Sequence, residues 1–206
     1  MPTVPSIKGS VFVSLVEDVQ KLLASGQLKR DELSRWLKPP DLELLGTPVL
    51  AHEWYDVRAY ARLAELLRDV EGGGKNEYHV KRGARSARRL LDGGLYGQLE
   101  YMQSASFGRK SDPKERHEAF GRDLARTTTL SSAILNFGRW SAKPDPEHPR
   151  RWLMEIAGAR DYPDALAWAS LGFTNELARV KDRSEDFWVW ERPERDRILF
   201  RMKFDP

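Results

Sequence analysis

The spacing of apolar residues changes once along this chain, and that change constrains the fold more than any other feature of the sequence. Up to about residue 133, apolar side chains recur every three or four positions, as they do along one face of an α-helix. From residue 134 onward, apolar and polar residues alternate in short runs, which is typical of strands with one buried face. The sequence therefore predicts an α+β protein, with a helical first two-thirds packed against a C-terminal antiparallel sheet.

The C-terminal third predicts the order strand–strand–helix–strand–strand. NFGRWSA and RRWLMEIAG flank the proline-rich turn KPDPEHP, and a helix is expected to begin at Pro163 in YPDALAWASLGFTNELARV. The last segment, DFWVWERPERDRILFRMKF, is typical of a hairpin that turns near Pro193. We expect residues 1–206 to form a single domain, in which residues 1–133 are mainly helical and residues 134–206 form the sheet with its crossover helix.

Local signals mark the ends of two of the predicted helices. In VFVSLVEDVQKLLASG, apolar residues recur at helical spacing until Gly26, where the helix is expected to end. The carboxylate of Asp56 can accept hydrogen bonds from the unpaired amides of a first turn, so a further helix is predicted directly after it. Glycines 72–74 are expected to end that helix.

The segment HVKRGARSARRLL, residues 79–91, predicts an amphipathic helix with a basic outer face. Wound as a helix, it places Val80, Ala84, Ala87 and Leu91 on one apolar stripe. Gly83 is small enough to let the helix lie close to a neighbour. The basic residues assigned to the outer face are Lys81, Arg82, Arg85, Arg88 and Arg89.

Three interpretations of this basic face stay open: a solvated surface, a site for phosphates or another anion, and a contact with a charged protein. The segment lacks interleaved aromatic residues for base stacking, and it has no Asn or Gln to read base edges. The 34 Lys and Arg residues exceed the 31 Asp and Glu residues only slightly, whereas a dedicated nucleic-acid binder usually shows a clearer excess. A nucleic-acid-associated protein is therefore the alternative interpretation, not the leading one.

The tryptophans suggest contact surfaces. If Phe187 and Val189 face the core, Trp188 and Trp190 face outward, where large apolar side chains often mark an interface with a partner. The alternatives are that a second layer buries both indoles in the core, or that they line a ligand pocket. A groove between the helices and the sheet would have as its candidate wall residues Trp54, Tyr60, Trp140 and Trp168.

No arrangement of residues predicts catalysis, a metal site or a cofactor. The chain has no cysteine, which excludes disulfides, thiolate chemistry and Cys-based zinc sites. The segment HEWYD places His52 near two carboxylates without forming an H-E-x-x-H motif. We expect the other histidines, His79, His117 and His148, to be exposed. No serine lies in a G-x-S-x-G motif, so the chain is more consistent with a binding protein than with an enzyme.

Several segments resemble a family of myxobacterial paralogues of unknown function. They are IKGSVFVSLV, LLGTPVLAHEWYDVRAYARLAELL, VKRGARSARRLLDGGLY, ILNFGRWSAK, ALAWASLGF and the C-terminal hairpin. That family is similar to vinyl reductase-type small-molecule-binding domains and, more distantly, to haem NO-binding domains. The resemblance implies a helical N-terminal part on a C-terminal antiparallel sheet, in a sensor or regulator that often dimerises. The cysteines of the first group and the Tyr-x-Ser-x-Arg motif of the second are missing from this sequence.

The start of the chain lacks a signal-peptide pattern, and no stretch approaches the ~18 apolar residues that a membrane span needs. The leading prediction is therefore a non-enzymatic, cytoplasmic regulatory or adaptor protein. It would act through protein contacts, as a homodimer, and it would sense a small ligand if the groove between helices and sheet exists.

Overall fold

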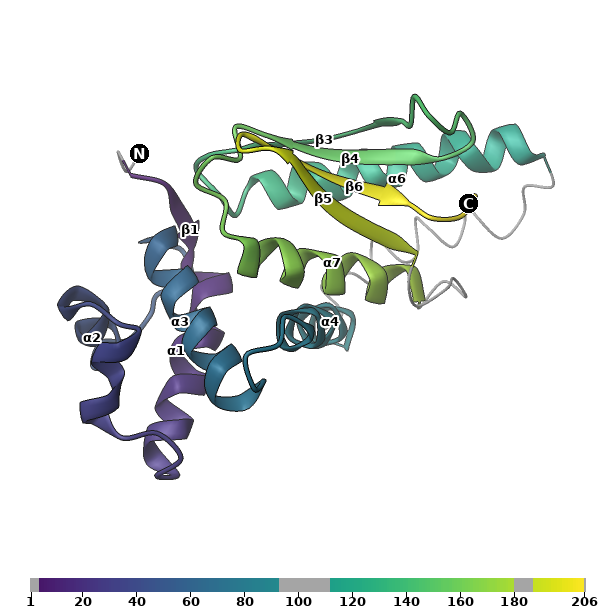
Figure 1. Ribbon diagram of the computed structural model, residues 1–206. Coiled ribbons are helices and arrows are strands. Elements are labelled where there is room, and N and C mark those ends of the chain that lie inside the picture. Colours follow the sequence, from purple (N-terminus) through teal and green to yellow (C-terminus); the bar gives the residue numbers. More distant parts are fainter. Residues whose placement is uncertain (1–3, 93–111, 180–186, 206) are drawn as a thin grey trace.

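The computed structural model of the chain describes residues 4–92, 112–179 and 187–205, and it confirms the predicted α+β fold class (Figure 1). The first part contains strand β1 (Ser6–Lys8), helix α1 (Gly9–Ala24), the 3-10 helix η1 (Arg30–Arg35), α2 (Pro39–Leu44), β2 (Trp54–Asp56), α3 (Val57–Glu71) and α4 (Glu77–Asp92). The second part contains α6 (Pro113–Ser132), β3 (Arg139–Pro144), β4 (Trp152–Ala157), α7 (Asp164–Arg179), β5 (Trp188–Glu194) and β6 (Arg197–Met202). None of the described helices is long and apolar enough to cross a membrane.

The second part forms a four-stranded antiparallel sheet in the order β3-β4-β6-β5, with α7 as the predicted connection between the two strand pairs. In Figure 1, α6 runs along the sheet and α7 runs beneath β5. Because side chains alternate along each strand, the register places Met154, Phe200 and Trp190 in one row on one face. We call this the inner face. The opposite, outer face carries ion pairs such as Glu155 with Lys143 and Arg197.

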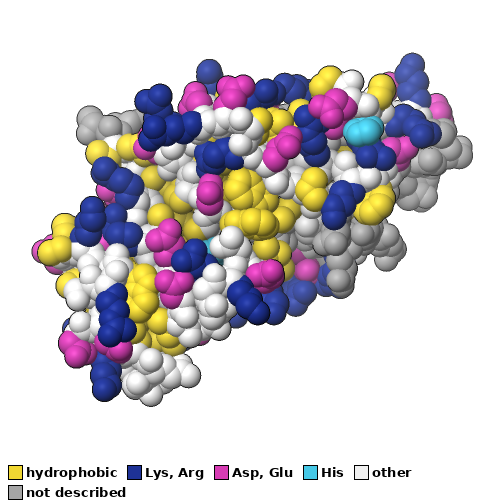
Figure 2. All heavy atoms as spheres, viewed as in Figure 1, with side chains coloured by type: hydrophobic (Ala, Val, Ile, Leu, Met, Phe, Trp, Pro, Cys, Tyr) yellow, Lys and Arg dark blue, Asp and Glu magenta, His cyan; other side chains and the backbone are white. Residues whose placement is uncertain are grey.

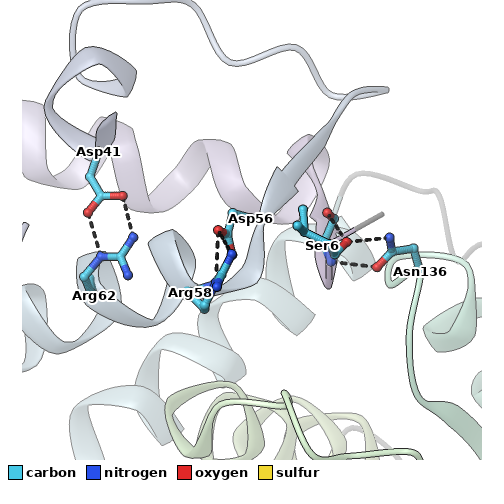
Figure 3. Close-up of polar contacts among 7 residues, drawn as sticks. Ser6, Asp41, Asp56, Arg58, Arg62 and Asn136 are labelled. Atoms are coloured by element: carbon cyan, nitrogen blue, oxygen red, sulfur yellow. Dashed lines mark hydrogen bonds and ion pairs between the residues drawn. The ribbon is translucent and has the colours of Figure 1, made fainter. Parts of the chain in front are cut away.

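The local signals that the sequence offers work as expected in α3. Asp56 caps the helix, because its side chain accepts a hydrogen bond of 2.9 Å from the backbone N–H of Arg58. At the other end, Gly73 and Gly74 have φ angles of 57° and 75°, in the left-handed region that glycine adopts without strain. In the same region, Arg62 of α3 forms a double hydrogen bond with the buried Asp41 (Figure 3).

A short ladder of hydrogen bonds joins the helical part to the sheet part. The backbone N–H of Asn136 donates to the carbonyl of Ser6 at 3.1 Å, and the side-chain amide of Asn136 accepts from Ser6 N–H and donates to the carbonyl of Val4 (Figure 3). Lys8 N–H donates to the carbonyl of Ile134 at 2.9 Å. One continuous hydrophobic cluster runs through both parts, so α1 and α3 pack against the same core as the sheet.

Helix α4 is present, but it is rotated from the predicted orientation. Its buried positions are His79, Arg82, Gly83 and Ala87, whereas Val80 is only half-buried. The expected exposure of His79 and of Arg82 is therefore wrong. The reason is steric: a Cβ atom on Gly83 would lie 1.8 Å from the carbonyl oxygen of Ala169, so α4 meets α7 closely at Gly83, and of the predicted apolar stripe only Ala87 is buried.

The start of β5 does not alternate as an outward interface would require. Trp188 is buried and Val189 is exposed, so Trp188 belongs to the core, which was one of the alternatives open for this residue. Phe187, which precedes the strand, is buried as well. The side chain of Asn175 explains the orientation, because it accepts from the backbone N–H of Trp188 and donates to its carbonyl, fixing the start of β5 against α7.

Candidate functional site

Three aromatic side chains form a continuous surface on the inner face of the sheet, which we call the aromatic platform: Trp140, Phe200 and Trp190. Trp140 stacks on Phe200 with ring centroids 5.5 Å apart and an interplanar angle of 18°. Trp190 lies directly opposite Phe200 in the register of β5 and β6. The platform thus draws on strands β3, β6 and β5, with Phe200 at its centre.

Two aromatic residues from the α7 segment cover this platform. Tyr162, just before α7, meets Trp140 edge to face, with centroids 6.3 Å apart. Trp168, within α7, meets Trp190 at 5.1 Å and 87°. Edge-to-face pairs are favourable because the positive edge of one ring meets the negative face of the other. The sheet and α7 therefore face each other through aromatic rings in this region, and Figure 2 shows hydrophobic side chains gathered in the middle of the molecule, between the sheet and the helices.

The platform contains two hydrogen-bond donors that have no acceptor among the described residues. The indole Nε1 atoms of Trp140 and Trp190 are both buried, and neither has a partner in the part of the chain that the structure describes. Two other indoles are satisfied: Trp36 donates to Asp69 at 2.8 Å, and Trp152 donates to the carbonyl of His117 at 3.1 Å. Since an indole can only donate, and an unpaired buried donor costs about 1–3 kcal/mol, the platform is suited to a ligand or water that brings acceptor atoms.

The groups behind the platform are uncharged. Burial raises the pKa of Tyr162, whose hydroxyl lies 2.9 Å from the hydroxyl of Ser170. Burial likewise raises the pKa of Tyr60, on α3, to about 12, and its phenol is close enough to interact electrostatically with that of Tyr162. Both phenols are therefore neutral at ordinary pH. Two cations act on these phenols, and both are paired: Arg82, near Tyr60, bonds Asp18 at 2.5 Å, and Arg192, near Tyr162, bonds Asp164 at 2.8 Å.

Three of the four residues predicted to line a pocket lie at or next to the platform, and one does not. Trp140 lies in the platform, Trp168 covers it, and Tyr60 is buried next to Tyr162. Trp54 lies elsewhere, on β2, with the ammonium of Lys8 4.2 Å from its ring. Two residues of this site were not predicted from the sequence. Phe200 has the pattern of an ordinary core residue of the hairpin, and Tyr162 has no distinguishing feature apart from its place before Pro163.

Of the five cations predicted for the basic face of α4, two are engaged inside the protein and three have no ion pair to the described residues. Arg82 points inward, where it bonds Asp18 and the hydroxyl of Ser14. Arg88 forms a double hydrogen bond with the buried Glu176 at 2.7 and 3.1 Å. Hydrogen bonds from Arg179 and Arg88 lower the pKa of Glu176 to about 2. The remaining three residues are exposed and have no ion pair to any described residue: Lys81, Arg85 and Arg89.

The four histidines form no site with one another. His52 and His148 are exposed, whereas His117 on α6 is half-buried, with Nδ1 3.1 Å from the carbonyl of Arg150 and its ring 5.1 Å from that of Trp152. The buried His79 has an unpaired Nε2, and burial followed by the charges of Arg68 and Arg82 lowers its pKa to about 4. Among the described residues, no three His, Asp or Glu side chains are grouped as they would be to hold a metal ion.

Comparison with known proteins identifies the fold. No protein-family profile matches the sequence, and no curated protein is similar enough to match it. Solved structures do match, however, and two of them are H-NOX (haem NO-binding) proteins from K. algicida in the Fe(II) unliganded state. A point mutant has a TM-score of 0.61 at 14% identity, and the other has 0.54 at 12%; each match covers 95% of both chains.

A variant of the Tt H-NOX protein has a TM-score of 0.51 at 15% identity, over 97% of both chains. At such identities, similarity in structure extends to the fold and not to the chemistry. The chain is thus a distant structural relative of the H-NOX proteins, as its sequence segments suggested, and it shares their arrangement of helices and antiparallel sheet.

Proposed function

We propose that this protein is a non-enzymatic regulatory domain that binds a small, uncharged ligand at the aromatic platform and signals through protein contacts. The observation that carries the proposal is the pair of buried, unpaired indole donors on Trp140 and Trp190. Buried polar groups in folded proteins nearly always have partners, so two exceptions on one aromatic surface favour a site that a ligand completes. The similarity to H-NOX structures supports a ligand-sensing role.

The H-NOX fold implies haem, but the histidines of this chain do not fit a histidine-ligated haem. Such a haem needs an imidazole nitrogen directed into the interior. The ring of His117 is engaged with Trp152 and with the carbonyl of Arg150. The buried Nε2 of His79 lies among Arg68, Asp69 and Arg82, and the described aromatic ring next to its imidazole is that of Tyr78, not one of the platform. The remaining two histidines are exposed. A histidine-ligated haem is therefore not part of the proposed site.

The lining indicates which class of ligand fits. Stacked and edge-on rings favour a flat, apolar molecule, and the unpaired indoles require at least one acceptor such as a carbonyl oxygen. A charged ligand is disfavoured, because Arg82 is already paired with Asp18 and the phenols of Tyr60 and Tyr162 are neutral. We therefore expect a planar, neutral carbonyl compound of modest size.

The test uses the indole N–H signals of the ¹⁵N-labelled full-length protein, which has seven tryptophans. Three probes of similar shape separate the contributions: coumarin is neutral and has a carbonyl, naphthalene has no acceptor, and 2-naphthoate carries a charge. Coumarin should shift the signals of Trp140 and Trp190 and leave that of Trp54 unchanged. Naphthalene and 2-naphthoate should bind at least several-fold more weakly.

Matched substitutions sharpen the same test. Trp140→Phe removes an unpaired donor and should weaken coumarin binding about fivefold, the value of one hydrogen bond of about 1 kcal/mol. Trp36→Phe removes a donor that is already satisfied by Asp69, away from the platform, and should leave binding unchanged. Equal binding of coumarin and naphthalene, or unmoved Trp140 and Trp190 signals, would contradict the proposal.

The quaternary state and the location belong to the same proposal. We propose a homodimer in the cytoplasm, formed by a single domain of residues 1–206. Light scattering on a size-exclusion column, at low and high salt, should give twice the chain mass at both salts and an absorbance ratio free of nucleic acid. A monomer at all concentrations would contradict the dimer and leave the ligand site to be judged by the indole signals alone.

A further inference from the structure

The outer face of α4 carries cations at every fourth position, which we call the basic row: Lys81, Arg85 and Arg89. All three are exposed, and none forms an ion pair with any residue in the described ranges. This differs from much of the molecule, where arginines such as Arg62, Arg192 and Arg201 bond carboxylates of the chain itself. Figure 2 shows Lys and Arg side chains gathered along the lower edge of the molecule, where Figure 1 places α4.

Helix α4, which carries the basic row, is fixed on its inner side by contacts with α7 and α1. On its inner side, the backbone at Gly83 lies against Ala169, and that at Val80 lies against Gly172. Arg82 bonds Asp18 of α1, and Arg88, on the flank of the row, bonds Glu176 of α7. The row therefore has a fixed spacing and a fixed direction, and it needs no rearrangement of α4 to meet a partner.

We propose that the basic row is a docking surface for an acidic helical segment of a partner protein. The three cations are four residues apart, and at 1.5 Å per residue successive members lie about 6 Å apart along the helix axis. A partner helix with Glu or Asp at every fourth position presents carboxylates at the same spacing. Side-by-side helices would then form a ladder of charge pairs, which favours fast association and correct register.

The surroundings of the row favour a protein over nucleic acid. Two exposed carboxylates, Glu77 and Asp92, stand at the two ends of α4, where they would repel a phosphate backbone that continued past the row. They do not conflict with a short acidic segment. Arg82 and Arg88 are already paired and contribute little attraction for phosphates. Tyr78, the nearest aromatic residue, is hydrogen-bonded to Glu71 and not presented for stacking on a base.

The test measures binding of labelled probes to the full-length protein by fluorescence anisotropy at low salt. The first probe is a stapled helical peptide with Glu at every fourth position over three turns. The second has the same composition with its Glu residues at other spacings, and the third is a 20-base-pair DNA duplex. The regularly spaced peptide should bind at least about fivefold more tightly than the second peptide and more tightly than the duplex, and added salt should weaken it.

Charge reversal locates the surface. The triple variant Lys81→Glu, Arg85→Glu and Arg89→Glu should lose at least about tenfold in peptide affinity. A control with the same change in net charge is Arg30→Glu, Arg139→Glu and Arg195→Glu, three exposed residues without ion pairs to the described chain. It should lose less than about twofold, and circular dichroism establishes that both variants fold.

Three results would overturn the proposal: equal losses in the two triple variants, equal binding of the two peptides, or tighter binding of the duplex than of either peptide. None of these results depends on the ligand site, because the measurements are made without coumarin. Failure of the docking surface and failure of the proposed ligand site are therefore observed in separate experiments.

Discussion

Two sides of α7 are built in opposite ways. Toward α4, the contact is made of backbone against backbone at Gly83 and Gly172, and it is flanked by the ion pair of Arg88 with Glu176. Toward the sheet, Trp168 meets the aromatic platform, where two indole donors are buried without acceptors. The first contact is closed and leaves no room for an added atom. The second contains polar groups that nothing in the described chain satisfies.

This difference indicates which side provides stability and which provides function. A tightly packed, fully paired contact is what a fold needs to hold two helices in one relative position. An unpaired buried donor only lowers stability, unless a ligand or a water molecule completes it. Mutations toward α4 should therefore unfold the protein, whereas mutations in the platform should change binding more than stability.

The largest expected effect is that of Gly83→Ala. A Cβ at this position would lie 1.8 Å from the carbonyl oxygen of Ala169, so the two helices must separate. We expect a loss of about 3–4 kcal/mol in the free energy of unfolding, even though alanine favours the helix by about 1 kcal/mol. Urea denaturation measures it. Gly46→Ala is the control, because its Cβ would lie 3.7 Å from the nearest atom, and similar midpoints for the two variants would contradict the close contact.

The next effect is that of Arg82→Ala, which tests the inward position of this residue. It removes the buried partner of Asp18, which keeps only the exposed Lys21, and it also removes the bond to Ser14, so we expect a loss of about 2–3 kcal/mol. Arg85→Ala, three residues further along the same helix, should change the free energy of unfolding by less than ~0.5 kcal/mol because its side chain is exposed. Equal losses would show that Arg82 is a surface residue after all.

Acid should destabilise the protein in two steps. Burial lowers the pKa of His79 from 6.5 to about 4, so the unfolded chain binds a proton that the folded protein excludes between these values. The contribution of the neutral His79 to the free energy of unfolding is fully present above pH 6.5. It is lost as the pH falls toward 4, by at most about 1.4 kcal/mol per pH unit. Glu176, with its pKa lowered from 4.5 to about 2 by Arg179 and Arg88, contributes stability that is lost between these two values.

The variant His79→Asn separates the two steps. Thermal denaturation between pH 7.5 and 3 should show no decline between pH 6.5 and 4.5 in this variant, while the decline below pH 4.5 remains. An unchanged profile in His79→Asn would mean that the imidazole is not buried in the neutral form.

The smallest expected effect on stability is that of Trp140→Phe in the ligand-free protein. The substitution removes some packing but also an unpaired donor, so the net change should be within about 1 kcal/mol. Trp152→Phe removes a satisfied donor and the ring that lies over Gly121, and it should cost more, about 2 kcal/mol. A larger loss for Trp140→Phe than for Trp152→Phe would mean that the platform is ordinary core.

Much of the fold could be predicted because its signals are local. The cap at Asp56, the glycines after α3 and the hairpin near Pro193 each depend on residues close together in the chain. The prediction was wrong or stayed open where a distant residue decides the outcome. Arg82 points inward because it donates a hydrogen bond to Asp18, 64 positions away. Trp188 is buried because the side chain of Asn175 bonds its backbone and holds it against α7.

Only part of the candidate site could be predicted from the sequence, for the same reason. Trp140 and Trp168 could be proposed as pocket residues from their type and their place between helices and strands. Phe200 and Tyr162 could not, because the sequence alone does not show that β6 lies between β4 and β5 or that the start of α7 lies over β3. For Trp190 a partner interface, the core and a ligand pocket were all left open, and the register of β5 with β6 places it opposite Phe200 on the inner face.

Periodicity and capping act within a few residues, so the fold class, the order of the C-terminal elements and the ends of α3 could be predicted without knowing any long-range contact. The sequence did not show which cations of α4 lack an ion pair to the described residues, or which indoles meet on the inner face. Those outcomes depend on strand register and on the close approach of α4 to α7, and both are set by contacts between segments far apart in the chain.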